Sequence, residues 1–493
     1  MYKIWVGLIA CLLALGCGRE ELKTIDILFV TDVQGFYFSR PEPRLDNQQA
    51  GGYAVLKNFL QQKYPSALLF DGGNWFGSGA EGTLSKGGYV AALAKSISFT
   101  AGTITDKDLM YGWPVARNII KQLDYPFVVS NLELENQIPW PLHDYQIRTV
   151  DNIKIGIFGL IAPFTKDQER LPGLVVKDPT ETAQKMVNLL KEKGVHYIVV
   201  LSSLGLGTAS GGSNAALAAE VDGIDLILSS NQGSEISESE TINQTLIISP
   251  SSKLDSVGHI TLFFDKNKQL RSHSFEDEPL LKDKYGEDET LAAQADVLLN
   301  QTRKQMNQKL STATQEIKTD LTAQSALGSL LAQCLHKWAK LDGVILNAAS
   351  IRSSLPQGTI TEFDLYKAYP YGDNITFLTI KGQALTQALQ ASLNAPDNYP
   401  QIAGFSVQYT QIAGTKSIAR ITLDNGRIVR PDDTYRVAVT DHVLAGGFGH
   451  DEFVNSLEFK STFVEARQIM RSCIVRQKNV EVPSSQGRWF EVK

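Results

Sequence analysis

Short apolar runs alternate with amphipathic segments along the first half of the chain. Seven apolar runs have the length of buried strands, and most of them lead into polar residues: 67–71, 126–130, 154–160, 197–202, 224–229, 245–249 and 257–265. Runs of this length, separated by segments with helical spacing, are typical of sheets covered by helices. The pattern predicts an α/β domain that ends near residue 275. Site residues are expected in the loops after its strands.

The second half begins after a charged segment, EDEPLLKDKYGEDE. Apolar residues then recur at helical spacing from Leu291 to Leu310, which predicts a linker helix within 276–310. A further α/β region follows over 311–493, with a helix start signal at Thr361. The expected organisation is therefore a signal segment over 1–16, one domain over 17–275, the linker helix, and a second domain over 311–493.

The first residues, MYKIWVGLIACLLALGC, combine a basic start with a short apolar run and small residues before Cys17. This pattern predicts a secretory signal, and Cys17 followed by Gly18 resembles a bacterial lipoprotein cleavage site. We expect lipidation at Cys17 and a lipid-anchored protein of the bacterial cell envelope, at the outer membrane. The alternative is ordinary signal cleavage that leaves Cys17 as a free thiol.

The formal net charge is −6, and no cluster of Lys and Arg has the density of a nucleic-acid site, so no nucleic-acid partner is expected. After removal of the signal, Cys334 and Cys473 remain, far apart and without metal-site spacing. They could be two buried thiols or one disulfide. Buried thiols are the favoured interpretation.

A series of motifs in order, IDILFVTD, LLFDGGNWFGSG, KIGIFGLIAP, NAASIR, YPQIAGFSVQY and AVTDHVLAGGFG, covers almost the whole mature chain. Together they resemble the secreted 5′-nucleotidase family, which includes UDP-sugar hydrolases and 2′,3′-cyclic-nucleotide phosphodiesterases. The resemblance implies a four-layer αββα metallophosphatase domain, a linker helix and a C-terminal α/β substrate-binding domain. It also implies hydrolysis at two divalent metal ions.

The metal-site positions implied by this resemblance are mostly replaced. Asp32 keeps one expected carboxylate and is the weak metal candidate, together with Asp106. No catalytic residue is assigned, and the degenerate positions are Gln34, Asn74, Asp106, Lys107, Ser203, Asn231 and Gly233. The remaining histidines His143, His196 and His259 are interpreted as structural or surface residues.

Two interpretations of this site remain. In the favoured one, the Lys107 ammonium takes the place of a metal and neutralises Asp32, so that the protein binds no cofactor and acts as a pseudoenzyme. In the other, Asp32, Asp106 and Asp108 hold a weakly bound Mg²⁺ or Ca²⁺ in an active phosphohydrolase.

The C-terminal substrate site is better preserved in this comparison. Asn347 and Arg352 keep the ends of the family's phosphate-contacting loop, Tyr399 and His442 take the two base-stacking positions, and Phe448 replaces a polar Asp. These residues could retain weak binding of a nucleotide or nucleoside, or they could simply pack a groove. A protein partner at the cell envelope is also expected.

Overall fold

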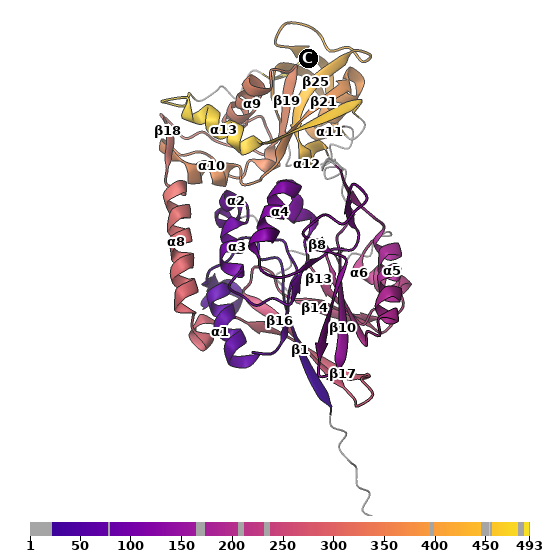
Figure 1. Cartoon of the computed structure of the whole chain (residues 1–493). Helices are drawn as coiled ribbons and strands as arrows, with labels where there is room; N and C mark the ends of the chain where they lie inside the picture. The colour runs from indigo at the N-terminus through magenta and orange to yellow at the C-terminus, as the bar shows by residue number, and fades with distance from the viewer. Residues whose placement is uncertain are drawn as a thin grey trace, which may run out of the picture.

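The computed structural model describes residues 22–76, 79–163, 173–205, 212–230, 237–394, 399–444, 453, 456–481 and 488–492. Two α/β regions lie one above the other and are joined by a long helix (Figure 1). Cys17, Asn231, Gly233 and Phe448 lie outside the described residues.

The N-terminal domain is built on two sheets. The first has the order β17 (Leu270–Pro279), β16 (Ser256–Phe264), β1 (Lys23–Val30), β4 (Leu68–Asp71), β5 (Ala101–Gly102), β6 (Phe127–Val128) and β8 (Leu142–His143). The second has the order β14 (Glu238–Ile242), β15 (Thr245–Ser249), β13 (Leu226–Ser229), β12 (Tyr197–Ser202), β10 (Ile153–Leu160) and β9 (Tyr145–Val150). Two small pairs, β2 (Arg40–Glu42) with β3 (Gln48–Ala50) and β7 (Leu132–Leu134) with β11 (Leu174–Val176), complete its strands.

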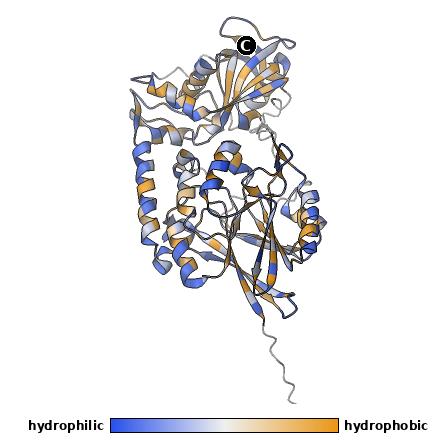
Figure 2. Cartoon of the chain, in the orientation of Figure 1, coloured by the Kyte–Doolittle hydropathy of each residue, from blue (hydrophilic) through white to orange (hydrophobic). Residues whose placement is uncertain are grey.

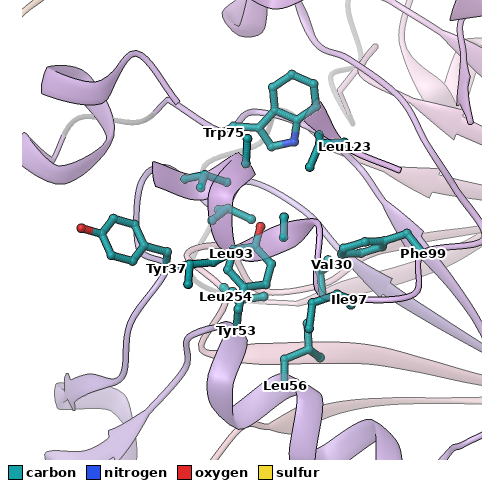
Figure 3. Close-up of a cluster of buried hydrophobic side chains, with 14 of the residues drawn as sticks. Val30, Tyr37, Tyr53, Leu56, Trp75, Leu93, Ile97, Phe99, Leu123 and Leu254 are labelled. Carbon is teal, nitrogen blue, oxygen red and sulfur yellow. The ribbon is translucent and has the colours of Figure 1, made fainter. Parts of the chain in front are cut away.

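Strand β1 shows how the layers form. Ile27 and Phe29 point into the core between the two sheets, whereas Leu28 and Val30 belong to the core under the helices. This alternation follows from the two-residue period of a strand. The helices on this side are η1 (Pro43–Leu45), α1 (Tyr53–Lys63), α2 (Ala80–Ser85), α3 (Gly88–Ala94), η2 (Asp106–Leu109) and α4 (Trp113–Gln122). Figure 3 shows Val30 near Tyr53 and Leu56 of α1 in this core.

The second sheet is covered on its outer side by α5 (Pro179–Glu192) and α6 (Asn214–Glu220). Val187 and Leu190 of α5 pack there against Phe158 and Val200 of the sheet. In Figure 2 the helices carry hydrophobic residues along one side and hydrophilic residues along the other. The predicted four-layer αββα arrangement is confirmed.

The linker differs from the predicted bounds. Strand β17 continues to Pro279, beyond the expected boundary at 275, and a short helix α7 (Lys282–Tyr285) follows. The long helix α8 (Glu289–Met306) starts at Asp288, whose side chain accepts a hydrogen bond from the Leu291 amide. Leu310 was expected in this helix, but it lies in β18 (Lys309–Ala313), because that segment pairs with β20 (Gly358–Thr361).

The C-terminal domain has a five-stranded sheet between helices. Its order is β22 (Pro400–Ala403), β19 (Gly343–Asn347), β25 (Thr434–Thr440), β21 (Asn374–Lys381) and β26 (Glu458–Glu465), beside a smaller sheet of β24 (Thr415–Leu423), β23 (Phe405–Ile412) and β27 (Trp489–Glu491). Its helices are α9 (Ala326–Ala339), η3 (Ala348–Ser350), α10 (Glu362–Ala368), α11 (Gly382–Leu393), α12 (Asp441–Leu444) and α13 (Ala466–Val475). Thr361 caps α10 as predicted.

Helices α9 and α13 share one hydrophobic core on the same face of this sheet. Their packing brings Cys334 and Cys473 to a Cα–Cα distance of 5.6 Å, and the two residues form a disulfide. The favoured prediction of two free thiols was therefore wrong. The reason is that residues 139 positions apart in the sequence come to face each other only through the packing of the two helices.

Candidate functional site

The loops after β1 and β4 form the centre of the expected metal site. The two strands are parallel neighbours, so both loops leave the sheet at the same edge. The backbone N–H groups of Asp32 and Gln34 bind the carbonyls of Gly73 and Asn74 at 3.1 and 3.0 Å. Asp32, Gln34 and Asn74 have φ angles of 49, 50 and 60°, a left-handed conformation that Asp and Asn tolerate better than most residues. The structure therefore brings these three predicted positions together.

Asn74 donates directly to the Asp32 carboxylate. Its Nδ2 lies 2.5 Å from Asp32 Oδ1, and the Thr31 hydroxyl donates to Oδ2 at 3.0 Å. Asp32 is 1% exposed and Asn74 is 7% exposed. The amide must present its nitrogen, because its oxygen would repel an ionised carboxylate at this distance. A hydrogen bond to a charged group contributes about 1.5–3 kcal/mol, so the amide stabilises the ionised Asp32 carboxylate.

Asp108, a candidate metal ligand in the alternative interpretation, accepts three hydrogen bonds from backbone N–H groups. Its Oδ2 accepts from the backbone N–H groups of Asn74 and Thr105 at 2.7 and 2.9 Å, and its Oδ1 accepts from Trp75 N–H at 2.8 Å. Burial raises the pKa of Asp108 to about 7, although these donors oppose the shift. These bonds hold the Asp108 side chain between the two loops.

Lys107 pairs with Asp106 and not with Asp32. The Nζ–Oδ2 distance is 3.1 Å, and the lysine side chain is 55% exposed whereas Asp106 is 7% exposed. The prediction that this ammonium neutralises Asp32 is therefore corrected. The cause is local: both residues belong to the single turn η2, which begins at the Thr105 capping box. An ion pair with so exposed a partner contributes at most about 1 kcal/mol.

Asp71 is a site residue that the motif comparison did not single out. Its carboxylate accepts from Gly73 N–H at 2.9 Å, Trp75 Nε1 at 3.0 Å and the Tyr125 hydroxyl at 2.6 Å. Burial raises its pKa. The Asp-Gly-Gly sequence directly after a buried strand was the available signal, since a buried Asp there needs backbone donors.

Ser203 occupies a predicted ligand position on the second sheet. It is 1% exposed, and its hydroxyl accepts from the Ala162 N–H at 3.1 Å. Next to it in the chain, Ser202 donates to Asn214, which in turn donates to Ser229 at 2.8 Å. The side chains of Ser202, Asn214 and Ser229 therefore form hydrogen bonds with one another.

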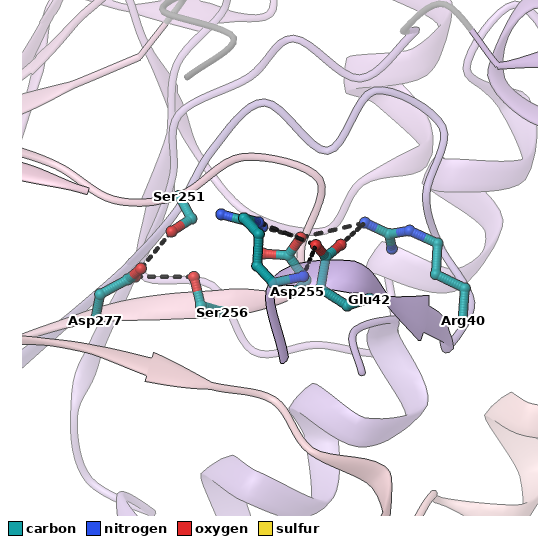
Figure 4. Close-up of polar contacts among 7 residues, drawn as sticks. Arg40, Glu42, Ser251, Asp255, Ser256 and Asp277 are labelled. Carbon is teal, nitrogen blue, oxygen red and sulfur yellow. Dashed lines mark hydrogen bonds and ion pairs between the residues drawn. The ribbon is translucent and has the colours of Figure 1, made fainter. Parts of the chain in front are cut away.

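A second group of polar side chains holds the segment 251–256, which contacts the backbone of Asp32. Arg44 and Arg40 bind the buried Asp255 at 2.6 and 3.4 Å, and Ser256 donates to Asp277 at 2.8 Å (Figure 4). In the same segment the backbone N–H of Lys253 donates to the Asp32 carbonyl at 2.7 Å. The ion pairs therefore position the chain around the Asp32 loop.

His259 was expected to be structural, and it lies in a network of acids. Its Nε2 is 2.8 Å from Asp26 and its Nδ1 is 3.0 Å from the Tyr64 hydroxyl. With Glu276 and Glu278 it has a geometry that could hold a metal ion. Lys63, however, places its Nζ 2.5 Å from Glu278, so this carboxylate already has a cationic partner.

In the C-terminal domain, three predicted substrate residues lie at one edge of the sheet. Strand β19 ends at Asn347, which pairs with Pro400 next to Tyr399, and the parallel strand β25 ends just before His442. Asn347 is fully buried and accepts from the Ser350 hydroxyl at 2.8 Å. The register therefore brings Asn347, Tyr399 and His442 to the same edge.

The Tyr399 ring is already packed. It is 5% exposed, with its centroid 5.1 Å from Trp489 in an edge-on arrangement and the Lys416 ammonium 5.0 Å away. His442 is exposed, and so is Arg352, whose Nη1 donates to the Ala349 carbonyl at 3.3 Å. A base stacked between Tyr399 and His442 would have to displace existing contacts of the tyrosine.

Comparisons with known proteins find similarity to nucleotide phosphoesterases. Residues 302–455 match the model of the 5′-nucleotidase C-terminal domain family. The trifunctional nucleotide phosphoesterase YfkN of Bacillus subtilis is 25% identical, over 82% of this chain and 30% of YfkN. The 5′-nucleotidase of Bos taurus is 24% identical, over 81% of this chain and 78% of its own length. The chain spans about a third of YfkN and of the B. subtilis endonuclease YhcR.

Solved structures share the two-domain fold. A Staphylococcus aureus protein in complex with α-ketoglutarate superposes with a TM-score of 0.75 at 19% identity, over 96% of this chain and all of that one. The 5′-nucleotidase precursor of Thermus thermophilus has a TM-score of 0.64 at 20% identity, over 95% of this chain and 99% of its own. Among the residues described for the present chain, no helix has the length and apolar character needed to cross a membrane.

Proposed function

We propose, from the premise that the chain belongs to the 5′-nucleotidase family, that it is a pseudoenzyme that no longer hydrolyses phosphate esters at two metal ions. It acts instead as a binding or interaction module. The observation that carries this proposal is the 2.5 Å contact from Asn74 Nδ2 to Asp32 Oδ1. In a two-metal site, Asp32 and a bridging ligand at position 74 would bind the same cation. Here an N–H donor from position 74 faces the Asp32 carboxylate instead.

The remaining side chains that could act as metal ligands do not fit a centre with two metal ions. Such a centre needs several imidazoles and carboxylates around two ions. Among the described residues of this site, Asp108 is bound by backbone N–H groups, Asp106 is paired with Lys107, and the Ser203 hydroxyl accepts from Ala162. A set in which each acceptor already has a donor or cation has little to gain from a divalent ion.

Hydrolysis assays test this proposal. The mature protein is incubated with AMP, UDP-glucose, 2′,3′-cyclic AMP or bis-p-nitrophenyl phosphate, each with Mn²⁺, Zn²⁺ or Co²⁺. We expect no turnover above the level of an Asp32→Ala variant purified in parallel, which controls for contaminating phosphatases. Turnover above about 1 s⁻¹ that is lost in Asp32→Ala, together with stoichiometric metal, would instead establish the active hydrolase with an oxygen-ligated site.

Any nucleotide or nucleoside binding is proposed to be weak, in the micromolar to millimolar range. The support is the packed ring of Tyr399. Arg352 and His442 are exposed and accessible to a ligand. Calorimetric titration with AMP and adenosine checks this, with Arg352→Ala as the variant. A nanomolar affinity for AMP in the parent would contradict the proposal.

The location proposed is the bacterial cell envelope, through a lipid on Cys17, where a protein partner would be engaged. The support is the signal-like segment that ends in Leu-Gly-Cys-Gly. Cys17→Ser should release the protein from the membrane fraction. Equal membrane association of the parent and this variant would remove the lipid anchor from the proposal.

A further inference from the structure

A cavity of about 440 Å³ lies in the C-terminal domain between helices α9 and α13. Figure 1 labels these two helices. Cys334 and Trp338 line it from α9, Cys473 lines it from α13, and Arg476 lines it from the position directly after α13. Residues three or four positions apart share one face of a helix, so each helix presents a continuous wall to the cavity. The disulfide between Cys334 and Cys473 joins the two walls.

The charged side chains that line this cavity are all cationic. Lys337 comes from the last turn of α9 and Arg476 from the end of α13, and no carboxylate is among the lining residues. Within the described part of the chain, neither cation has an acidic partner within ion-pair distance. Cations are common at the carboxyl ends of helices because the helix dipole favours them. Here two of them, from different helices, line one cavity.

The rest of the wall is apolar and aromatic. Trp338 is 39% exposed, with its ring centroid 5.6 Å from that of Phe377. Val464 and Ile469 line the cavity beside it. A large aromatic side chain left accessible in a concave site is typical of small-molecule pockets, and 440 Å³ falls within their usual range of about 300–1,000 Å³.

We propose that this cavity binds a small organic anion with a flat apolar body, of the class of aromatic sulfonates and carboxylates. Its ring lies against Trp338, and its anionic group lies between Lys337 and Arg476. The inference does not depend on the proposed function, because the cavity lies between α9 and α13 and not at the sheet edge that carries Asn347 and His442.

The probe for the experiment is 8-anilinonaphthalene-1-sulfonate, a fluorescent aromatic sulfonate. The full-length mature protein is titrated at low salt, and the emission of the probe is followed. We expect one saturable site per chain, with an affinity that falls as salt is added, because the paired charges are partly exposed to solvent. Sodium 1-naphthoate, which has the same ring and a different anionic group, should compete with it.

Charge reversal identifies the site. Lys337→Glu combined with Arg476→Glu should weaken binding at least tenfold, and both positions are exposed, so thermal unfolding should show an intact fold. The matched control is Lys340→Glu with Lys478→Glu, which makes the same charge change at exposed residues outside the cavity. Trp338→Ala should also weaken binding. Equal affinity in the two double variants, or no saturable site in the parent, would overturn the proposal.

Discussion

Replacing Asn74 by Asp would convert the amide that faces Asp32 into a second carboxylate. The present contact is 2.5 Å from Asn74 Nδ2 to Asp32 Oδ1, and both side chains are less than a tenth exposed. The substitution changes no volume and leaves the backbone bond from Asn74 N–H to Asp108 in place. Its effect on stability therefore measures the electrostatic role of the amide.

The expected loss at pH 7 has two parts. The charge-assisted hydrogen bond, which contributes about 1.5–3 kcal/mol, is removed. Two ionised carboxylates cannot share this buried position, so one of them must take up a proton, at a cost of about 1.4 kcal/mol per pH unit above its pKa. A shared O–H···O bond recovers part of that cost. We expect a net decrease of about 3–5 kcal/mol in the free energy of unfolding.

Urea denaturation followed by circular dichroism measures this loss, with Asn188→Asp as the matched control. Asn188 is exposed on α5, where its side chain accepts from Gln184 at 3.3 Å, so the same chemical change should cost less than about 0.5 kcal/mol. The deficit of Asn74→Asp should shrink at pH 5, where the shared proton costs less, and Mn²⁺ should raise the stability of this variant. An Asn74→Asp variant as stable as the parent at pH 7 would refute the role assigned to the amide.

Much of the fold could be predicted from the sequence because its cues are local. The apolar run at 197–202 was predicted as a strand and forms β12, Tyr197–Ser202, since a short apolar run between polar turns has few other structures available. The Thr361 capping box likewise depends on residues three positions apart. The end of α8 was missed because Leu310 continues the helical spacing, while its actual partner, the strand β20, lies about fifty residues away.

The candidate site was predicted less completely, because its contacts are long-range or depend on one turn. Motif order correctly placed Asp32 near Asn74, which are 42 positions apart. It could not show that Asp108 would be held by backbone N–H groups, nor that Lys107 would turn toward Asp106. Packing decided both outcomes. The same holds for Tyr399, whose ring meets Trp489 only because β27 pairs with β23.

Two further predictions concern stability. Burial raises the pKa of Asp225 to about 6, so ionisation of this carboxyl disfavours the folded state. The stability that its protonated form contributes is therefore lost as pH rises from about 4 through 6. Asp225→Asn keeps an acceptor for the Ile198 N–H. Its free energy of unfolding, relative to that of the parent, should rise by up to about 3 kcal/mol between pH 4 and 7. A difference between the two proteins that stays independent of pH in urea titrations would contradict this. The disulfide closes a loop of 139 residues, for which the chain-entropy estimate is about 5 kcal/mol. Cys334→Ser with Cys473→Ser should therefore lower the unfolding free energy of the C-terminal domain by about 2–5 kcal/mol. A reducing agent should lower the stability of the parent by a similar amount and leave the double variant unchanged, because the disulfide acts mainly by restricting the unfolded chain. Equal unfolding midpoints for the oxidised parent and the double variant would show that the packing of α9 against α13 suffices without the disulfide.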